Sequence, residues 1–131
     1  MKVGLLRAVG AATAVYGIAV TALPDLLARP SGLVDDEGKS EPATRISLRP
    51  LGWRDAASGL AMVLAPAGPA LRTAACVRLA ADFGDAVLLG ATLPDRARKK
   101  AVAVSVGWGA LSLVGLLAKE RQPREGRPQG E

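Results

Sequence analysis

The chain contains no histidine and only one cysteine, Cys76, among its 131 residues. A single cysteine cannot form a disulfide within one copy, so an internal dithiol redox mechanism is excluded. The usual zinc, haem and di-iron sites need histidine or several cysteines. We therefore expect no metal and no cofactor, and we interpret Cys76 as a small packing residue.

Aromatic residues are scarce as well, at 3% of a chain that is 50% apolar. A water-soluble core normally uses more large rings to fill its volume. Small residues instead suit helices in lipid, where close backbone approach provides the van der Waals contact. A soluble bundle, the alternative, would show a polar outer face on every helix, and residues 8–23 and 101–118 show none. The composition therefore favours a membrane protein.

Basic residues outnumber acidic ones by 17 to 12. They gather at the ends of apolar segments, as in residues 96–100 and 119–124, and form no basic stripe with interleaved rings. This placement suits anionic lipid headgroups, so we expect a lipid bilayer as partner and no nucleic acid. The loops and termini expected on the two sides of the membrane carry nearly equal positive charge. The orientation is therefore left open, and a dual topology is included.

Four apolar segments predict four membrane helices, at about residues 3–28, 49–65, 70–93 and 101–118. Pro50 suits the first turn of the second helix. A solvated loop at residues 31–47 and two short turns separate the segments. The expected fold is an all-α integral membrane four-helix bundle with up-down-up-down order, formed by residues 1–118. A disordered polar tail would follow at residues 119–131.

The expected location is a cell membrane, such as a bacterial inner membrane, that the chain crosses several times; homo-oligomers are left open. Lys2 and Arg7 precede the first apolar segment, and a cleaved signal peptide is the alternative to a first membrane helix. A stripe of small residues suits tight helix packing along that segment: Gly10, Thr13, Ala14 and Gly17. The Thr13 hydroxyl can bond back to its own helix and needs no partner helix.

The third apolar segment carries three charged residues, Arg78, Asp82 and Asp85. Their spacing places all three side chains on one helix face. A charge at the centre of a bilayer costs roughly 2.5–3.5 kcal/mol on insertion scales. Such residues are tolerated where they face a bundle interior, find partners or serve a function. This face is therefore the predicted site.

The second segment supplies partners for this face. Its uncharged part is too short to span a bilayer, which takes about 20 residues, so Arg54 and Asp55 must enter with it. A proline-rich turn then brings the second and third segments together as a hairpin. We expect Arg54 to face Asp82 or Asp85. We expect Arg78 to face Asp55 or Asp82. Arg54 and Asp55 are sequence neighbours, so we do not expect them to pair.

When two carboxyl groups lie close together beside an arginine, one of them can stay protonated as an acid while the other is ionised. The candidate catalytic residues are Asp82, Asp85 and Asp55. The candidate substrate-binding residues are Arg49, Arg54, Arg78, Trp53 and Trp108. Together they predict cofactor-independent isomerase or cyclase chemistry on a lipophilic polyketide-like or terpenoid-like small molecule. The alternatives are a small proton-coupled transporter, or an accessory subunit with a structural ion-pair network.

Residues 48–59 resemble the R-x-x-G-x-R-D-x-x-x-G pattern of the DUF4267 family of small four-helix membrane proteins. The matching positions are Arg49, Gly52, Arg54, Asp55 and Gly59. The Leu23-Pro24 pair and the two aspartates of the third segment are similar too, so the resemblance covers roughly residues 10–117. It implies the architecture and the place of the site, and no biochemical activity.

Overall fold

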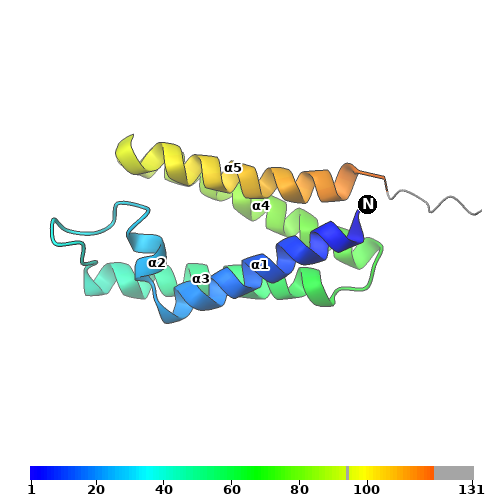
Figure 1. Ribbon diagram of the computed structural model, residues 1–131, viewed down its shortest axis with the longest axis horizontal. Coiled ribbons are helices and arrows are strands. Elements are labelled where there is room, and N and C mark those ends of the chain that lie inside the picture. Colours follow the sequence, from blue (N-terminus) through cyan, green and yellow to red (C-terminus); the bar gives the residue numbers. More distant parts are fainter. Residues whose placement is uncertain (94, 120–131) are drawn as a thin grey trace, which may run out of the picture.

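The structure, a computed structural model, describes residues 1–93 and 95–119, and it is all-α there, as predicted (Figure 1). Its five helices are α1 (Val3–Ala22), α2 (Asp25–Ala28), α3 (Pro42–Leu64), α4 (Pro69–Thr92) and α5 (Asp95–Leu117). The expected polar tail lies outside the described residues from residue 120 onward.

The first predicted helix, residues 3–28, is two helices. α1 ends at Ala22, where the N–H of Leu23 still donates to the Ala19 carbonyl at 2.7 Å. Pro24 has no N–H to continue this pattern and its ring clashes with the preceding turn. The chain therefore turns at Pro24 and forms the short helix α2.

The second predicted helix begins seven residues earlier than expected, at Pro42 instead of residue 49. Pro42 occupies the first turn, so Pro50 lies inside the helix. Both prolines carry the same start signal, and the prediction that the helix begins near Pro50 is wrong. A proline inside a helix removes one backbone hydrogen bond, which the rest of this long helix tolerates. The C-terminal part of the predicted solvated loop is therefore helical.

The last predicted helix also begins early, at Asp95 instead of residue 101. Asp95 in the first turn complements the positive end of the helix dipole. Arg98 pairs with Asp95 across one turn, with Nη1 and Oδ1 at 3.1 Å. These charges support a first turn of helix, so the predicted charged turn is instead the beginning of α5.

α1 and α3 pack antiparallel through glycines on both helices. Gly10 faces Gly59, and Gly17 faces Gly52 one heptad along each helix. A Cβ atom added at Gly59 would lie 2.5 Å from both the Gly10 carbonyl oxygen and the Ala14 nitrogen. The two backbones therefore touch, with no room for a side chain. The small-residue stripe predicted for the first segment is confirmed as an interface within the chain.

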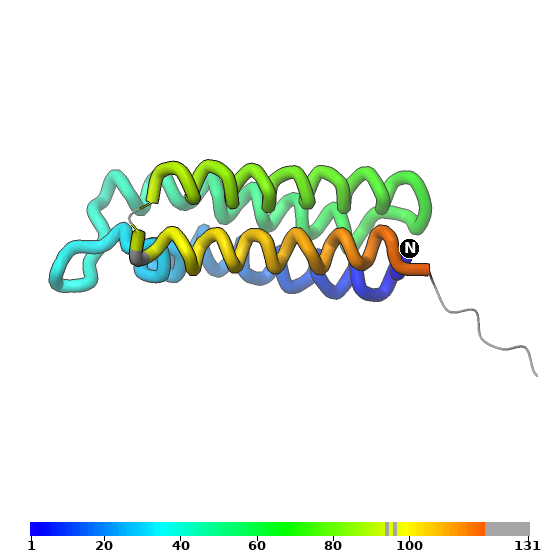
Figure 2. Tube along the Cα trace, turned by 90° about the horizontal axis from the view of Figure 1, so that it is seen from above, coloured from blue at the N-terminus to red at the C-terminus, as the bar shows by residue number. Residues whose placement is uncertain are grey.

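α4 and α5 form a second antiparallel pair, in which Gly90 lies against Val102 and Gly109 against Phe83. Contacts within the two pairs are more extensive than contacts between them. All four long helices run along the molecule in alternating directions (Figures 1 and 2). We call the end with α2 and the start of α3 the loop end, and the end with the N-terminus the terminal end. The two pairs diverge toward the loop end (Figure 1).

The terminal end holds the apolar core. It consists of buried Leu6, Val9, Met62, Leu71 and Ala75, with partly buried side chains such as Trp108 and Leu116 around them. α1 and α5 meet here, since the N–H of Lys2 donates to the Gly115 carbonyl at 2.7 Å. This end of the bundle is closed by packed side chains.

Trp108 joins α5 to α1 through one hydrogen bond. Its indole N–H donates to the hydroxyl oxygen of Thr13 at 2.7 Å, and Thr13 is buried. The expectation that Thr13 needs no partner helix is therefore wrong. Its hydroxyl oxygen is the acceptor for the Trp108 indole N–H, which has no other acceptor in the described structure.

We expect the Thr13→Val substitution to lower the free energy of unfolding by about 1–3 kcal/mol, because it leaves a buried indole N–H without an acceptor. Thermal unfolding measures this loss. Thr73→Val is the matched control, since the exposed Thr73 hydroxyl bonds only to its own helix. Combining Thr13→Val with Trp108→Phe should cost less than the sum of the single changes. Additive effects would contradict the hydrogen bond.

α2 is tied to the start of α3 by polar groups outside the long apolar segments. The Asp25 carboxylate accepts a hydrogen bond from the Ser40 hydroxyl and lies 3.4 Å from Nη2 of Arg45. Nε of Arg45 also donates to the Ser40 oxygen at 3.0 Å. The Ser40 hydrogen bond, with help from the Arg45 charge, holds the pKa of Asp25 below its ordinary value.

This contact should respond to acid. A depressed carboxyl pKa stabilises the fold fully above the unfolded value of about 3.9, and the stabilisation is lost as the pH falls through the lower folded value. An NMR titration of the Asp25 carboxyl carbon should therefore give a midpoint below the ordinary range. Ser40→Ala should move that midpoint upward. An unchanged midpoint in the Ser40→Ala variant would show that the hydroxyl does not hold the carboxylate.

The outer surface of the long helices is apolar. Among the described residues, 18 large hydrophobic side chains on these helices are exposed, and they include Val15 on α1, Val87 on α4 and Leu117 on α5 at about 70% exposure. Two segments, Val3–Ala22 and Ala97–Leu117, are long and apolar enough to cross a membrane, and most of each lies on the surface. α3 and α4 carry four charged residues each and do not meet this criterion.

Candidate functional site

Five of the predicted site residues come together between α3 and α4. We call Arg54, Asp55, Arg78, Asp82 and Asp85 the Arg/Asp cluster. Arg54 of α3 binds Asp85 of α4 with both ends of its guanidinium, at 3.0 Å from Nη1 to Oδ1 and 2.6 Å from Nη2 to Oδ2. This two-point geometry is the strong form of an arginine–carboxylate pair. The predicted contact of Arg54 with Asp82 or Asp85 is confirmed for Asp85.

Arg78 occupies the deepest part of the cluster. Its Nη1 lies 2.6 Å from Oδ1 of Asp55 on α3, and its Nη2 donates to Oδ1 of Asp82 one turn along α4. Both predicted contacts of Arg78 are confirmed. The pair of Arg78 and Asp82 is almost fully buried, with side-chain exposures of 5% and 2%.

Asp55 connects the two arginines. Its Oδ1 accepts from Arg54 as well, at 3.0 Å from Nη2 and 3.3 Å from Nε. The expectation that these sequence neighbours would not pair is therefore wrong. Adjacent positions on a helix point in different directions, but the Arg54 side chain is long enough to bend toward α4. There it meets the Asp55 carboxylate, which points the same way. The cluster is thus one continuous chain of ion pairs from Asp85 to Asp82.

Ser58 belongs to the site, although it is not among the predicted site residues. Its hydroxyl oxygen lies 3.3 Å from Nη1 of Arg78, and its hydroxyl donates to the Asp55 carbonyl at 3.2 Å. The signal was present, because Ser58 follows Arg54 by four positions and Asp55 by three, which places all three on one helix face.

Three predicted substrate-binding residues lie away from the cluster. Arg49 is exposed on α3, more than one turn closer to the loop end than Arg54. Trp53 is 66% exposed, because one residue before Arg54 corresponds to a different side of the helix. Trp108 faces Thr13 of α1. The structure does not bring these three to the charged groups.

Two polar atoms of the innermost ion pair have no hydrogen-bond partner among the described residues: Nε of Arg78 and Oδ2 of Asp82. One is a donor and the other an acceptor, and both belong to the same buried pair. Buried polar atoms are nearly always satisfied in folded proteins, so such exceptions call for an explanation. The inner pair therefore has one donor and one acceptor left without a partner in the described structure.

The cluster has an inner and an outer part. Side-chain exposure rises from 2% and 5% at Asp82 and Arg78 to 17% at Asp55. It reaches 26% at Asp85 and 38% at Arg54. Gly109 of α5 covers the inner part, since a Cβ atom added there would lie 3.5 Å from Cβ of Asp82. The cluster holds three carboxylates and two guanidiniums, so one carboxylate is in excess.

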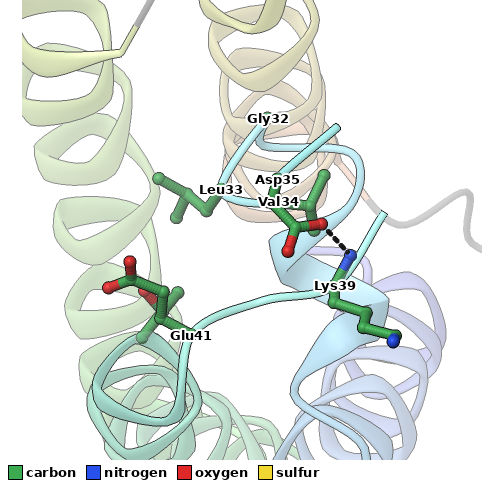
Figure 3. A pocket seen from close by; sticks show the side chains of 7 residues that line it. Gly32, Leu33, Val34, Asp35, Lys39 and Glu41 are labelled. Atoms are coloured by element: carbon green, nitrogen blue, oxygen red, sulfur yellow. Dashed lines mark hydrogen bonds between the residues drawn. The ribbon is translucent and has the colours of Figure 1, made fainter. Parts of the chain in front are cut away.

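A separate pocket of about 250 Å³ lies in the loop between α2 and α3 (Figure 3). Its lining residues are Gly32, Leu33, Val34, Asp35, Lys39, Glu41 and Thr44. The Asp35 carboxylate accepts the backbone N–H of Lys39 at 2.8 Å and so fixes the loop around the pocket (Figure 3). No predicted site residue lines it.

The positions of the DUF4267 pattern have distinct places in the structure. Gly52 and Gly59 form the α1–α3 interface, and Arg54 and Asp55 belong to the cluster. Membership of that family stays a prediction. No protein-family model, curated protein or solved structure matches the chain.

Proposed function

We propose that the chain is an integral membrane protein whose four long helices cross the bilayer as one bundle. The support is the distribution of polarity: large apolar side chains lie on the surface, whereas Arg78 and Asp82 are buried. Lipid tails can cover such a surface, and charges in a membrane are tolerated when they pair inside a bundle. In this arrangement the five charged residues of the Arg/Asp cluster face one another between α3 and α4.

The proposed activity is acid/base chemistry without a cofactor on a lipophilic substrate. The observation that carries it is the unpartnered donor and acceptor, Nε of Arg78 and Oδ2 of Asp82. An enolisable carbonyl compound suits this pair chemically, because a carbonyl oxygen accepts from an N–H such as Nε, and a carboxylate oxygen such as Oδ2 can take a proton from the neighbouring carbon. A lipophilic molecule of polyketide or terpenoid type commonly carries such a group.

The reaction balances with the residues of the cluster alone. Oδ2 of Asp82 takes a proton from the carbon beside the carbonyl, and the electrons of the broken C–H bond form a C=C bond. The carbonyl oxygen then carries negative charge, which the Arg78 N–H stabilises. Asp82 returns the proton to another carbon of the conjugated system, where a new C–H bond forms. The product is an isomer, and no electron donor or acceptor is needed.

Asp82→Asn tests the activity. The amide cannot take the proton, so turnover should fall by about 10²–10⁴-fold, the usual contribution of a general base. The purified protein is incubated with a lipid extract of its host, and mass spectrometry with chromatography detects isomers that form only with wild type. Asp95→Asn is the matched control, because Asp95 is exposed at the start of α5. Isomer formation that survives in the Asp82→Asn variant would remove Asp82 from the reaction.

A structural role of the cluster is the second candidate. The observation that favours it is the limited contact between α3 and α4, which the ion pairs of Arg54 with Asp85 and Arg78 with Asp55 bridge. In that case the cluster holds two helix pairs together and performs no chemistry.

A further inference from the structure

We infer that an aqueous path reaches the Arg/Asp cluster from the loop end alone, so that the site exchanges protons with the solution on that side. The inference rests on the membrane location proposed above. The proton that the cluster exchanges would then come from the solution on the loop-end side. Three independent features carry it: the depth of the cluster, the closed terminal end and the exposure of Arg54 and Asp85, which we call the outer pair.

The depth follows from the helices that flank the cluster. Lys100 is the last charged residue before the uncharged part of α5, and Gly109 lies beside Asp82. Nine residues at 1.5 Å each place Asp82 about 14 Å below Lys100. Arg54 follows the exposed Arg49 by five residues on α3, which places it only about 7–8 Å deep. The outer pair therefore lies in the half of the membrane nearer the loop end.

The terminal end offers no comparable route. Leu6, Met62 and Leu71 are fully buried there, and Ala75 lies in the same core cluster, one turn before Arg78. These side chains come from α1, α3 and α4, and Trp108 of α5 packs against them. A continuous apolar layer therefore separates the cluster from that side.

The exposure of the outer pair needs an explanation in a membrane. The Arg54 side chain is 38% exposed and that of Asp85 is 26% exposed. Contact of these charges with lipid tails would be costly, whereas contact with water or headgroups is not. Arg54 and Asp85 form the part of the cluster nearer the loop end, and the pocket near Leu33 lies at that same end (Figure 3). Water from the loop end can therefore reach the outer pair.

The groups around Asp82 define what such a path supplies. Arg78 and Asp85 lie on its own helix, and Arg54 and Asp55 face it from α3. α5 presents Gly109, which carries no charge. On α1, Tyr16 lies within electrostatic reach of Asp55. The excess carboxylate of this set can exchange one proton with water at the outer pair.

Thiol labelling in liposomes tests the path. Cys76→Ala removes the native thiol, and single cysteines are then introduced by Leu89→Cys, Leu88→Cys and Ala75→Cys. Leu89 follows Asp85 by four positions and Asp82 by seven, so it lies on the cluster face toward the loop end. Leu88 lies at the same depth but is 64% exposed on the apolar surface. Ala75 lies in the core at the terminal end. A charged, membrane-impermeant methanethiosulfonate reagent is added to both sides.

The Leu89→Cys variant should react at least about tenfold faster than either of the others, because the thiolate is the reactive form and apolar surroundings disfavour it. The more exposed position, Leu88, would thus be the less reactive one. Complete labelling of all three variants after denaturation in detergent controls for the amount of protein. Equal rates at Leu89 and Leu88, or rapid labelling at Ala75, would overturn the inference.

Failure of the path and failure of the proposed function give different results. If the chain is not embedded in the bilayer, alkaline carbonate releases it from membranes and the Leu88→Cys variant reacts rapidly. If the cluster performs no chemistry, the isomer assay is negative for wild type. Slow labelling at Leu89 in a protein that resists carbonate overturns the path alone.

Discussion

Replacing Gly17 with alanine should lower the free energy of unfolding by about 2–3 kcal/mol, at the upper end of overpacking effects. The added methyl group would collide with the Ala56 nitrogen and the Gly52 carbonyl oxygen of α3. These are backbone atoms, so no side-chain rotation relieves the collision. The helices must move apart, and the Gly10–Gly59 contact one heptad away then opens as well.

The matched control for this substitution is Gly107→Ala on α5. A Cβ atom at Gly107 meets no other atom within 4 Å. Alanine there should stabilise the helix by up to about 1 kcal/mol, because it has the higher helix propensity. Thermal unfolding in detergent, followed by circular dichroism, measures both variants. A Gly17→Ala variant as stable as wild type would show that α1 and α3 do not touch through their backbones.

Removal of the inner arginine should have the larger effect. Arg78→Gln leaves the buried Asp82 carboxylate without a cation, and loss of one partner of a buried ion pair costs about 3–5 kcal/mol. Arg54 continues to pair with Asp55, so the outer part of the cluster keeps its partner. The same unfolding measurement detects the loss. Lys39→Gln, which removes a highly exposed cation paired with Glu37, is the control and should change stability by less than about 1 kcal/mol.

A double substitution separates the chemical from the structural role of this pair. Arg78→Leu combined with Asp82→Leu replaces both charges by apolar side chains, which often restores or raises stability. We expect the double variant to fold better than the Arg78→Gln variant and to form no isomers from the lipid extract. If the double variant kept full isomer formation, the pair would be structural only. If the double variant were less stable than the Arg78→Gln variant, the buried ion pair would stabilise the fold more than two apolar side chains do.

The sequence predicted the cluster well because helix geometry fixes it. Arg78, Asp82 and Asp85 must share a face at their spacing, and the proline-rich turn after α3 forces Arg54 and Asp55 toward them. The small-residue stripe on α1 was predictable for the same reason, since its offsets follow the helix period. The stripe did not indicate which helix packs against it. That helix is α3, which contacts it through Gly52 and Gly59.

Helix starts and the roles of the tryptophans were harder to predict. Pro42 and Pro50 carry the same signal, and only the packing of α3 in the full structure decides between them. Trp53 points away from the site although it adjoins Arg54, because one position corresponds to a rotation of about 100° on a helix. The contact of Trp108 with Thr13 depends on how α5 rotates against α1, which no local pattern encodes.

We propose that Asp82 exchanges a proton inside the helix bundle. Infrared difference spectroscopy of the protein in liposomes tests it most directly, because a protonated carboxyl group has its own stretching band that shifts in heavy water. We predict a pH-dependent band that is present in wild type and in Asp95→Asn and absent from Asp82→Asn. A band that persists in the Asp82→Asn variant, or the lack of any such band in wild type across the accessible pH range, would contradict the claim.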